Sequence, residues 1–410
     1  MFDLDDPTLL FRADVLDDPA PLYAQLRRRA PVWEMPGTGT FVVSSAELVT
    51  EAVNRPADFS SNLLSLVFRG DDGRPVVFDM TRLGAAIYVL ATADAPTHTV
   101  HRKLLQPAFS PGAVERLAGS VAETADALLD PLLRTGRGDA ATRLAEPLPV
   151  RMICRVVGIP DDDVAALAPL VLQSNDLLAG VLDAEMMASA ATAAMETTKY
   201  LTDLLAGWRA GDRAEPTICR VLAGAVAAEE ITFEDAVGIL VQLLGAGTET
   251  TTGLIGRAVL QLARDPSLQQ RVRDRPDLVP AVLEETLRID GPFRFHYRAV
   301  THDTELGGVR IPAGSRLLLM WASANLDDAE IDRPEQFDVE RPVPRAHFAF
   351  GRGIHFCIGA PLARLEGRIV LERLLARTTS FAVDDDRAVR IRPSIFLRRL
   401  ASLPLTLVPA

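Results

Sequence analysis

The chain has 410 residues, 48% of them hydrophobic, and a formal net charge of −12. This length allows a sizeable core, and no Ser/Gly-rich linker or repeat divides the sequence, so we expect a single domain over 1–410. The acidic balance argues against nucleic acid as the main partner, because binding to phosphates needs a basic face.

The first residues of the chain and the spacing of its cysteines indicate the cellular compartment in which we expect the protein. The first residues, MFDLDDPTLL, carry acids where a signal peptide needs a basic start and an apolar run. No stretch approaches about 18 consecutive apolar residues, so we expect no membrane anchor. Cys154, Cys219 and Cys357 show no even, close spacing, which excludes a disulfide framework. We therefore expect a cytoplasmic protein.

The pattern of apolar residues predicts a mainly α fold with minor β sheets. Helical spacing extends over about 113–134, 142–157, 161–181, 185–210, 232–264 and 277–289. Shorter strand patterns lie near the ends, at 40–44, 309–320 and 396–408.

The longest helical pattern, 232–264, begins with Thr232 as a candidate N-cap and Asp235 three residues later, a variant of the capping box. In its middle lies LLGAGTETTTG. Each glycine there costs about 1 kcal/mol of helix stability relative to alanine. Two explanations fit these residues: a close crossing with another helix, or a helix that opens for a ligand.

A glycine-rich loop, FAFGRGIHFCIG at 348–359, contains Cys357. A thiolate that binds a metal needs close backbone approach and N–H donors directed at its sulfur, and glycine permits both. A strong helical pattern follows, with Pro361 in its first turn, so Cys357 would lie at a helix N-terminus that favours the thiolate. From these residues alone, a buried structural cysteine on a turn is the alternative.

The pattern F-G-x-G-x-H-x-C-x-G, complete at 350–359, resembles the haem-binding loop of the cytochrome P450 family. The resemblance extends over about residues 15–405. It implies a bacterial-type P450 fold with haem b (iron protoporphyrin IX) between the long helix and the helix after the cysteine loop. It also implies that Cys357 is the proximal thiolate ligand of the iron, that Phe350 and Gly351 lie beside it, and that His355 contacts a haem propionate.

Residues 246–251, AGTETT, resemble the oxygen-binding segment of the family. The resemblance implies that Ala246 and Gly247 lie at the haem in a widened part of the helix. It implies that Thr250 hydrogen-bonds the oxygen to be activated, and that Glu249 feeds protons from solvent. Family members that use only peroxide typically replace this acid–threonine pair. Its presence favours reductive activation of O2, which would be a co-substrate.

The stretch EETLRID at 284–290 resembles the E-x-x-R element of the family, in which Glu285 and Arg288 pair on one helical face. Their usual third partner is an arginine in a later Pro-acid-Arg-Phe stretch. This chain has PEQF at 334–337 instead. We therefore expect the pair to remain and the triad to be weakened.

A buried haem needs cationic or hydrogen-bonding partners for its two carboxylates. His98 and Arg102, four residues apart in DAPTHTVHRKLL, resemble the propionate-binding pair of similar proteins. Arg298 in FHYRAV fits the propionate arginine of the family. His296, two residues earlier, would point the same way along a strand. Exposure at the surface is the alternative for each of them.

The substrate positions implied by the resemblance are mainly aliphatic with a few aromatics, the usual lining of a lipophilic pocket. They lie in 76–90, 161–195, 243–250, 292–296 and 395–397, and include Val77, Leu243, Phe293, Arg294, Ile395 and Phe396. Alternation along a strand would place Arg294 on one face with His296 and Arg298. Arg294 would then orient an acidic substrate, or it would pair with a haem propionate or a nearby acid. A one-residue slip of the strand would instead turn Arg294 to solvent.

The resemblance implies a haem-thiolate monooxygenase that hydroxylates or epoxidises a lipophilic substrate. No flavin or nicotinamide fingerprint occurs, so we expect electrons from a ferredoxin or flavodoxin with an NAD(P)H-dependent reductase. Candidates for a basic docking patch are Arg102, Lys103, Arg345, Arg352 and Arg364. Two alternatives stay open: a haem-thiolate peroxygenase or isomerase without a reductase, and a non-catalytic haem-binding protein.

Overall fold

A computed structural model describes residues 1–80, 88–208, 217–342 and 347–410. Its α-helices are α1 (Ala13–Asp17), α2 (Ala20–Arg29), α3 (Ala46–Val53), α4 (Thr97–Leu105), α5 (Pro111–Glu115), α6 (Ala118–Thr135), α7 (Pro147–Val157), α8 (Asp161–Ser174), α9 (Ala184–Ala206), α10 (Ile218–Ala227), α11 (Phe233–Arg264), α12 (Pro266–Asp274), α13 (Val279–Asp290), α14 (Trp321–Ala324) and α15 (Ala360–Ala376). Its strands are β1 (Val32–Met35), β2 (Thr40–Val43), β3 (Phe59–Ser60), β4 (Ser65–Arg69), β5 (Pro75–Asp79), β6 (Arg137–Asp139), β7 (His296–Val300), β8 (Thr304–Leu306), β9 (Val309–Ile311), β10 (Arg316–Leu319), β11 (Thr378–Val383), β12 (Arg390–Ile391), β13 (Leu400–Ser402) and β14 (Pro404–Pro409).

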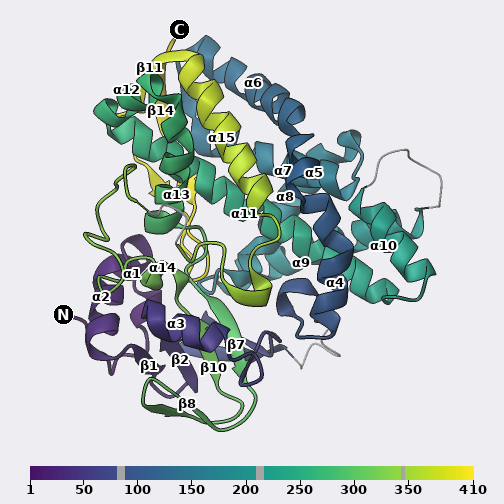
Figure 1. Cartoon of the computed structure of the whole chain (residues 1–410), viewed down its shortest axis with the longest axis vertical. Coiled ribbons are helices and arrows are strands. Elements are labelled where there is room, and N and C mark those ends of the chain that lie inside the picture. Colours follow the sequence, from purple (N-terminus) through teal and green to yellow (C-terminus); the bar gives the residue numbers. More distant parts are fainter. Residues whose placement is uncertain (81–87, 209–216, 343–346) are drawn as a thin grey trace.

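The prediction of a mainly α fold with small sheets is confirmed. The largest sheet in the described residues has the order β1-β2-β10-β7-β3, with β10 parallel to β2 and antiparallel to β7. It lies at one end of the molecule, below the helices in Figure 1. This sheet matters for the site because its strand β7 carries His296 and Arg298.

The helix α11 passes through the middle of the helical part and packs against α7 and α15 (Figure 1). Its 32 residues give a length of about 48 Å. The predicted capping box is confirmed: Asp235 N–H donates to Thr232 Oγ1 over 3.0 Å, and Thr232 N–H donates to Asp235 Oδ2 over 3.1 Å. The long helix therefore begins where the sequence places its cap.

The two glycines in the middle of α11 permit close packing. A Cβ at Gly247 would lie 3.0 Å from Ile153 of α7, and a Cβ at Gly245 would lie 2.7 Å from Asn175 Oδ1. The close-crossing explanation is thus correct for these glycines. The helical assignment is continuous through them, so the widening that the resemblance implies is not a break in the helix.

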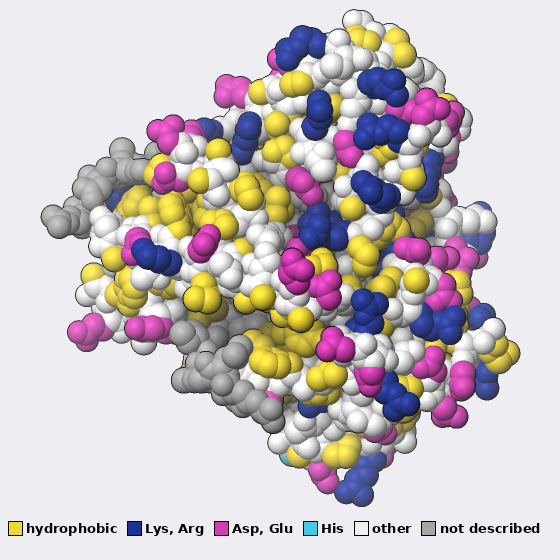
Figure 2. Space-filling model, turned by 180° about the vertical axis from the view of Figure 1, so that it is seen from behind, with side chains coloured by type: hydrophobic (Ala, Val, Ile, Leu, Met, Phe, Trp, Pro, Cys, Tyr) yellow, Lys and Arg dark blue, Asp and Glu magenta, His cyan; other side chains and the backbone are white. Residues whose placement is uncertain are grey.

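Charged side chains of both signs are interspersed with apolar ones over the face opposite to the view of Figure 1 (Figure 2). The net negative charge is therefore not gathered into a single acidic patch on this face. None of the helices in the described ranges combines the length and the apolar character that crossing a lipid bilayer requires.

A buried ion network joins α13 to the loop before the cysteine segment. Arg288 donates from Nη2 to Glu285 Oε1 over 2.7 Å and from Nε to Oε2 over 2.8 Å. Arg341 Nε donates to the same Oε1 over 3.2 Å. The expected weakening of the triad is therefore wrong, because Arg341 supplies the second guanidinium that Gln336 does not.

We predict that Arg341→Gln lowers the free energy of unfolding by about 2 kcal/mol, because it leaves the buried Glu285 short of one charged donor. Urea denaturation followed by far-UV circular dichroism would measure the change. Arg310→Gln is the control: its ion pair with Asp303 is exposed, and we expect a change below about 0.5 kcal/mol. Equal stability of the two variants would contradict a role for Arg341.

Candidate functional site

The loop before α15 is closed by a backbone hydrogen bond and held by two glycines in the left-handed region. Cys357 N–H donates to the carbonyl of Phe350 over 2.9 Å. Gly351 has φ +67° and Gly353 has φ +69°, where other residues are strained. A Cβ at Gly353 would also lie 2.8 Å from Val53 of α3. These glycines fix the path that brings Cys357 to the start of α15.

The sulfur of Cys357 faces backbone N–H groups at the N-terminus of α15, as predicted. Burial raises the pKa of the Cys357 thiol, while hydrogen bonds from the Gly359 and Ala360 N–H groups and the nearby charge of Arg102 lower it. Such donors stabilise a thiolate against the cost of its burial. The site therefore has what a cysteine ligand to a metal needs.

Four predicted polar residues meet around His355. Burial lowers the pKa of His355 to about 3, helped by the nearby Arg298, His98, His296 and Arg102. Its ring centroid lies 4.2 Å from that of His98 in α4. The imidazole is therefore neutral at physiological pH, and it is one member of a set of donors from α4, β7 and the cysteine loop.

The position of His355 also depends on residues that the sequence did not reveal. Its Nε2 lies 2.9 Å from Ser61 Oγ. Asp94 accepts hydrogen bonds from the Ser60 hydroxyl and, over 2.9 Å, from the Ser61 N–H. The end of β3 at Ser60 and the following Ser61 are thus held toward the histidine by a carboxylate 33 residues away from Ser61 in sequence.

Arg298 is a buried guanidinium whose hydrogen bond goes to a carbonyl. Nη1 donates to the Tyr297 carbonyl over 2.7 Å. Burial lowers its pKa to about 10, so it stays charged at neutral pH. None of the ion pairs among the described residues includes Arg298. A buried cation in this position is complementary to a carboxylate from a bound group.

His296 and Arg102 are also held in place. Trp321 Nε1 donates to His296 Nδ1 over 2.5 Å, so the proton of the neutral ring lies on Nε2. Burial lowers the pKa of His296 to about 3. Arg102 Nη1 donates to the carbonyl of Phe356 over 2.8 Å, which ties α4 to the cysteine loop.

Glu284 anchors the cysteine loop, a role that its sequence motif did not indicate. Arg364 of α15 donates to it from Nε over 2.6 Å and from Nη2 over 2.9 Å. His347 Nε2 lies 3.1 Å from Glu284 Oε2, the oxygen that also accepts from Arg364 Nη2. Burial alone would raise the pKa of Glu284, but the hydrogen bonds from Arg364 and His347 lower it to about 2.

The contact with Glu284 changes the expectation for Arg364, which was a candidate for the basic docking patch. Arg364 is paired with Glu284 and lies over the ring of Phe350, 4.5 Å from its centroid. Arg352 lies over the ring of Phe348. Lys103 is exposed. Arg345 is outside the described residues.

The middle of α11 leaves one face uncovered. Ala246 is exposed and Thr250, one turn later, is half-buried, although the helix around them is mostly buried. Thr250 Oγ1 donates to the carbonyl of Ala246 over 2.7 Å. A small side chain and a hydroxyl thus lie on the face where a flat ligand would approach.

Glu249 points to a different part of the structure and joins a chain of charges. Arg399 Nε donates to Glu249 Oε1 over 2.7 Å, and Arg399 Nη1 donates to Glu146 Oε1 over 2.7 Å. Burial raises the pKa of Glu249, although Arg399 opposes the rise. Its Oε2 has no hydrogen-bond partner. The buried carboxyl group therefore keeps one oxygen without a partner and is protonated more readily than an exposed glutamate.

This chain of charges reaches a surface pocket. The pocket is lined in part by Glu146, Asp176, Arg392 and Arg399. Glu146 has a side chain that is 19% exposed, and Asp176 pairs with Arg392. Solvent at the surface and the buried Glu249 are thus separated by Arg399 and Glu146.

Together these residues fit a haem. One sulfur faces two N–H donors, and a buried guanidinium lacks a carboxylate at ion-pair distance. Neutral imidazoles surround that guanidinium, and α11 presents a small exposed side chain at its centre. The donor set matches a thiolate-ligated iron porphyrin with two propionates.

The expected alternation that would place Arg294 on one strand face with His296 and Arg298 is wrong. Its guanidinium donates to the carbonyl of Val15 over 3.2 Å and to that of Leu16. It therefore points to α1, away from the face that Arg298 shares with His355. The strand β7 begins only at His296, so the alternation that was assumed does not extend back to residue 294.

The other expected substrate positions fall into two clusters. Phe396, Ile395 and Phe293 belong to or pack against one hydrophobic cluster, together with Val77. The rings of Phe293 and Phe396 lie 5.2 Å apart. Leu243 is buried in α11 and belongs to another cluster. Residues 81–87 of the expected stretch 76–90 lie outside the described residues.

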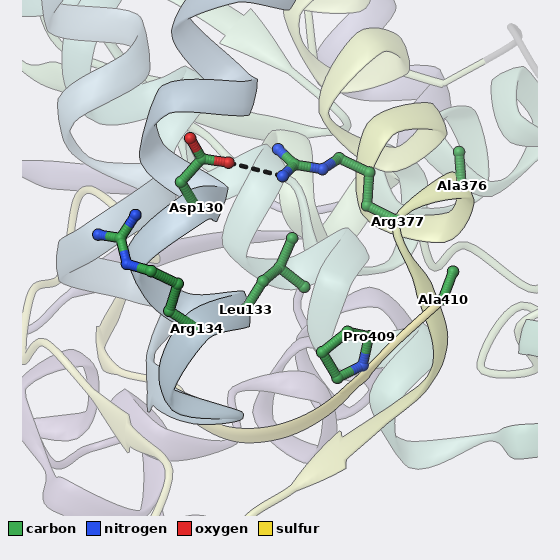
Figure 3. Close-up of a pocket in the computed structure, with 7 residues that line it drawn as sticks. All are labelled: Asp130, Leu133, Arg134, Ala376, Arg377, Pro409 and Ala410. Carbon is green, nitrogen blue, oxygen red and sulfur yellow. Dashed lines mark hydrogen bonds and ion pairs between the residues drawn. The ribbon is translucent and has the colours of Figure 1, made fainter.

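A second surface pocket lies far from this chemistry. It is lined by Asp130, Leu133, Arg134, Ala376, Arg377, Pro409 and Ala410 (Figure 3). Arg377 follows the last residue of α15, whereas Cys357 precedes its first, and a 17-residue helix is about 26 Å long. The ion pair of Arg377 with Asp130, 2.6 Å, crosses this pocket. We assign it no catalytic part.

Comparisons with known proteins agree with the geometry. Residues 219–400 match the family model described as "Cytochrome P450". The chain is 37% identical to Cytochrome P450 144 of Mycobacterium tuberculosis over 400 residues, covering 98% of this chain and 91% of the relative. It is 29% identical to the Steroid C26-monooxygenase of the same organism, over 95% of this chain and 93% of that protein.

Solved structures are similar over nearly the whole chain. The crystal structure of CalO2 has a TM-score of 0.85 and 28% identity, with 98% of both chains covered. The structure of CYP109E1 from Bacillus megaterium in complex with testosterone has a TM-score of 0.84 and 29% identity, with 96% of this chain and 98% of that chain covered.

We predict that Glu284 stabilises the fold above its ordinary pKa of 4.5, and that this stability is lost as the pH falls toward about 2. Glu284→Gln should therefore be less stable than the wild type at about pH 6, and the difference should shrink by about pH 3. Urea midpoints at both pH values test this. Glu47→Gln, an exposed change in α3, should alter neither midpoint. A constant difference for Glu284→Gln would contradict the account.

Proposed function

This chain belongs to the cytochrome P450 family and is a P450 monooxygenase, and we propose that it inserts one oxygen atom of O2 into a lipophilic organic substrate. The observation that carries the proposal is Cys357 at the N-terminus of α15, in a set with His355, His98, Arg102 and Arg298. We propose that Cys357 ligates haem b and that the other four bind its propionates. His296 would add an Nε2–H donor at the same edge.

A bound haem would supply the iron that activates O2, with the thiolate favouring O–O cleavage. The protein holds the sulfur in place and opposes the protonation that its burial favours. The N–H groups of Gly359 and Ala360 stabilise the charge on sulfur. The closure of the loop by the Cys357–Phe350 hydrogen bond fixes its direction. Glu284 of α13 binds Arg364 of α15 and lies 3.1 Å from His347 Nε2, directly before the loop.

The residues on the other side of the site would deliver protons. Thr250 has a hydroxyl on the uncovered face of α11, and its present acceptor is the carbonyl of Ala246. Glu249, with its raised pKa, can hold a proton near neutral pH more readily than an exposed glutamate. Arg399 stays charged, so it orients the carboxylate and does not transfer the proton itself. Arg399 lies between Glu249 and the surface pocket beside Glu146, so water would have to carry protons past its guanidinium.

A lipophilic substrate is supported by the apolar cluster that contains Phe293, Ile395 and Phe396. Val77 packs against the same cluster. Among the relatives, one is named a Steroid C26-monooxygenase and one structure holds testosterone. Steroids are therefore the first compounds to test for displacement of the haem-bound water. Arg294 gives no support for an acidic substrate, because its Nη1 and Nη2 groups donate to carbonyls of α1.

We propose that a ferredoxin or flavodoxin, reduced by an NAD(P)H-dependent reductase, supplies the electrons. The surface next to the cysteine loop presents Lys103 and Arg102 beside exposed apolar groups, Ile354 and Phe356. Exposed apolar groups near positive charge suit a small acidic redox protein. Arg364 contributes little to this charge, because Glu284 neutralises it.

We predict that Cys357→His retains haem and loses the strongly red-shifted absorption band that the reduced, carbon monoxide-bound protein gives with a thiolate ligand. The imidazole can replace the sulfur as a ligand but carries no negative charge. Reduced-plus-CO difference spectra measure the band. Cys154→Ala, a change of a buried cysteine in α7, is the control and should keep it. Survival of the band in Cys357→His would overturn the ligand assignment.

For Thr250→Ala we predict near-normal substrate binding and electron consumption, with product formation lower by about 10- to 100-fold and more peroxide released. The reason is that the alanine cannot pass a hydrogen bond to the oxygen being reduced. Coupling is measured as product formed per reductant consumed. Thr251→Ala, its buried neighbour on α11, should remain coupled. Unchanged coupling in Thr250→Ala would remove this residue from the relay.

A further inference from the structure

Two buried arginines, Arg257 and Arg294, and the partly buried Arg398 lie around one carboxylate at the end of α13. Arg257 Nη1 of α11 lies 2.8 Å from Asp290 Oδ2. Arg398 Nε donates to Asp290 Oδ1 over 2.5 Å. Arg294 is close enough for its charge to act on both Asp290 and Arg257. We call these four residues the arginine cluster. It is separate from the set around His355.

The arginine cluster carries more positive charge than its protein partners neutralise. Among the described residues, Asp290 is the one carboxylate that forms an ion pair with any of its three guanidinium groups. The remaining partners are neutral: Arg294 donates to the carbonyls of Val15 and Leu16, and Arg398 Nη1 donates to that of Asp17 over 2.7 Å. A buried excess of charge is costly without a counter-ion.

The ionisation of Tyr23 and Arg257 does not remove the excess positive charge of the arginine cluster at neutral pH. Burial raises the pKa of Tyr23, which contacts Arg294, so its phenol is neutral. Burial lowers the pKa of Arg257 to about 10, which still leaves it charged at neutral pH. Three positive groups therefore face one negative group in the interior.

Several donors of the arginine cluster have no acceptor. Arg257 Nε and Nη2 and Arg294 Nε are buried and have no hydrogen-bond partner. Arg257 is 5% exposed and Arg294 is 3% exposed, so both are more than nine-tenths buried. Guanidinium groups that are buried and still have free N–H groups are complementary to an anion.

We propose that the arginine cluster binds a small monovalent inorganic anion, of which chloride is the abundant example. The anion accepts hydrogen bonds from the free N–H groups of Arg257 and Arg294. It also offsets the positive charge that Asp290 does not neutralise. A small ion is favoured because the two arginines with free N–H groups, Arg257 and Arg294, are more than nine-tenths buried. The site thereby links α11 to α1, whose carbonyls are bound by Arg294 and Arg398.

Anion binding to the folded protein alone must stabilise it by mass action. The haem-loaded protein is therefore dialysed into gluconate, which is too large for the site. Chloride or bromide then replaces gluconate at constant ionic strength while Tm is recorded. We expect Tm to rise by about 2–4 °C and to saturate, because a specific site fills.

The matched variants are Arg257→Met and Arg264→Met. Both remove one arginine from α11, but Arg264 is exposed. The saturable rise in Tm should be lost in Arg257→Met and kept in Arg264→Met. Crystals of the wild type soaked in bromide should give an anomalous peak within hydrogen-bond distance of Arg257 and Arg294. This second measurement stands even if Arg257→Met fails to fold.

Three outcomes would overturn the proposal. One is an equal Tm in gluconate and chloride for the wild type. Another is the same halide response in both variants, which would mark a general salt effect. The third is electron density at Arg257 that fits water and gives no anomalous signal with bromide.

Discussion

The interaction on which the site depends is the stabilisation of the Cys357 sulfur by the first N–H groups of α15. Burial alone would keep this thiol protonated, and the donors of Gly359 and Ala360 oppose that effect. The glycines at 351 and 353 exist for the same purpose, because only their left-handed backbone brings the sulfur to the helix end. Any change that moves α15 relative to the loop would weaken the hydrogen bonds to the sulfur and so destabilise the thiolate form of Cys357.

Buried carboxylates hold the parts around this sulfur together. Glu284 ties α13 to α15 and to His347, and Glu285 ties α13 to Arg341. Glu249 is bound in the same way to Arg399. Hydrogen bonds from Arg364 and His347 lower the pKa of Glu284, whereas Glu249 keeps one free oxygen and a raised pKa. Glu284 and Glu285 are therefore suited to be fixed supports, whereas Glu249 is suited to exchange a proton.

The sequence predicted what local spacing encodes. The cysteine loop, the start of α15 and the capped start of α11 each depend on residues within about ten positions, and all three are confirmed. Contacts between distant residues were not predictable: Glu249 and Arg399 are 150 positions apart. Arg294 was misplaced because β7 starts after it. The expected helix 113–134 is two helices, α5 and α6, with residues 116–117 between them, a boundary that apolar periodicity does not mark.

The central claim is that iron in this protein is bound by one cysteine sulfur. X-ray absorption at the iron edge of the ferric wild-type protein tests it most directly, because sulfur and nitrogen neighbours scatter differently. Our account predicts one sulfur neighbour together with the porphyrin nitrogens. A first shell of nitrogen and oxygen alone would contradict it.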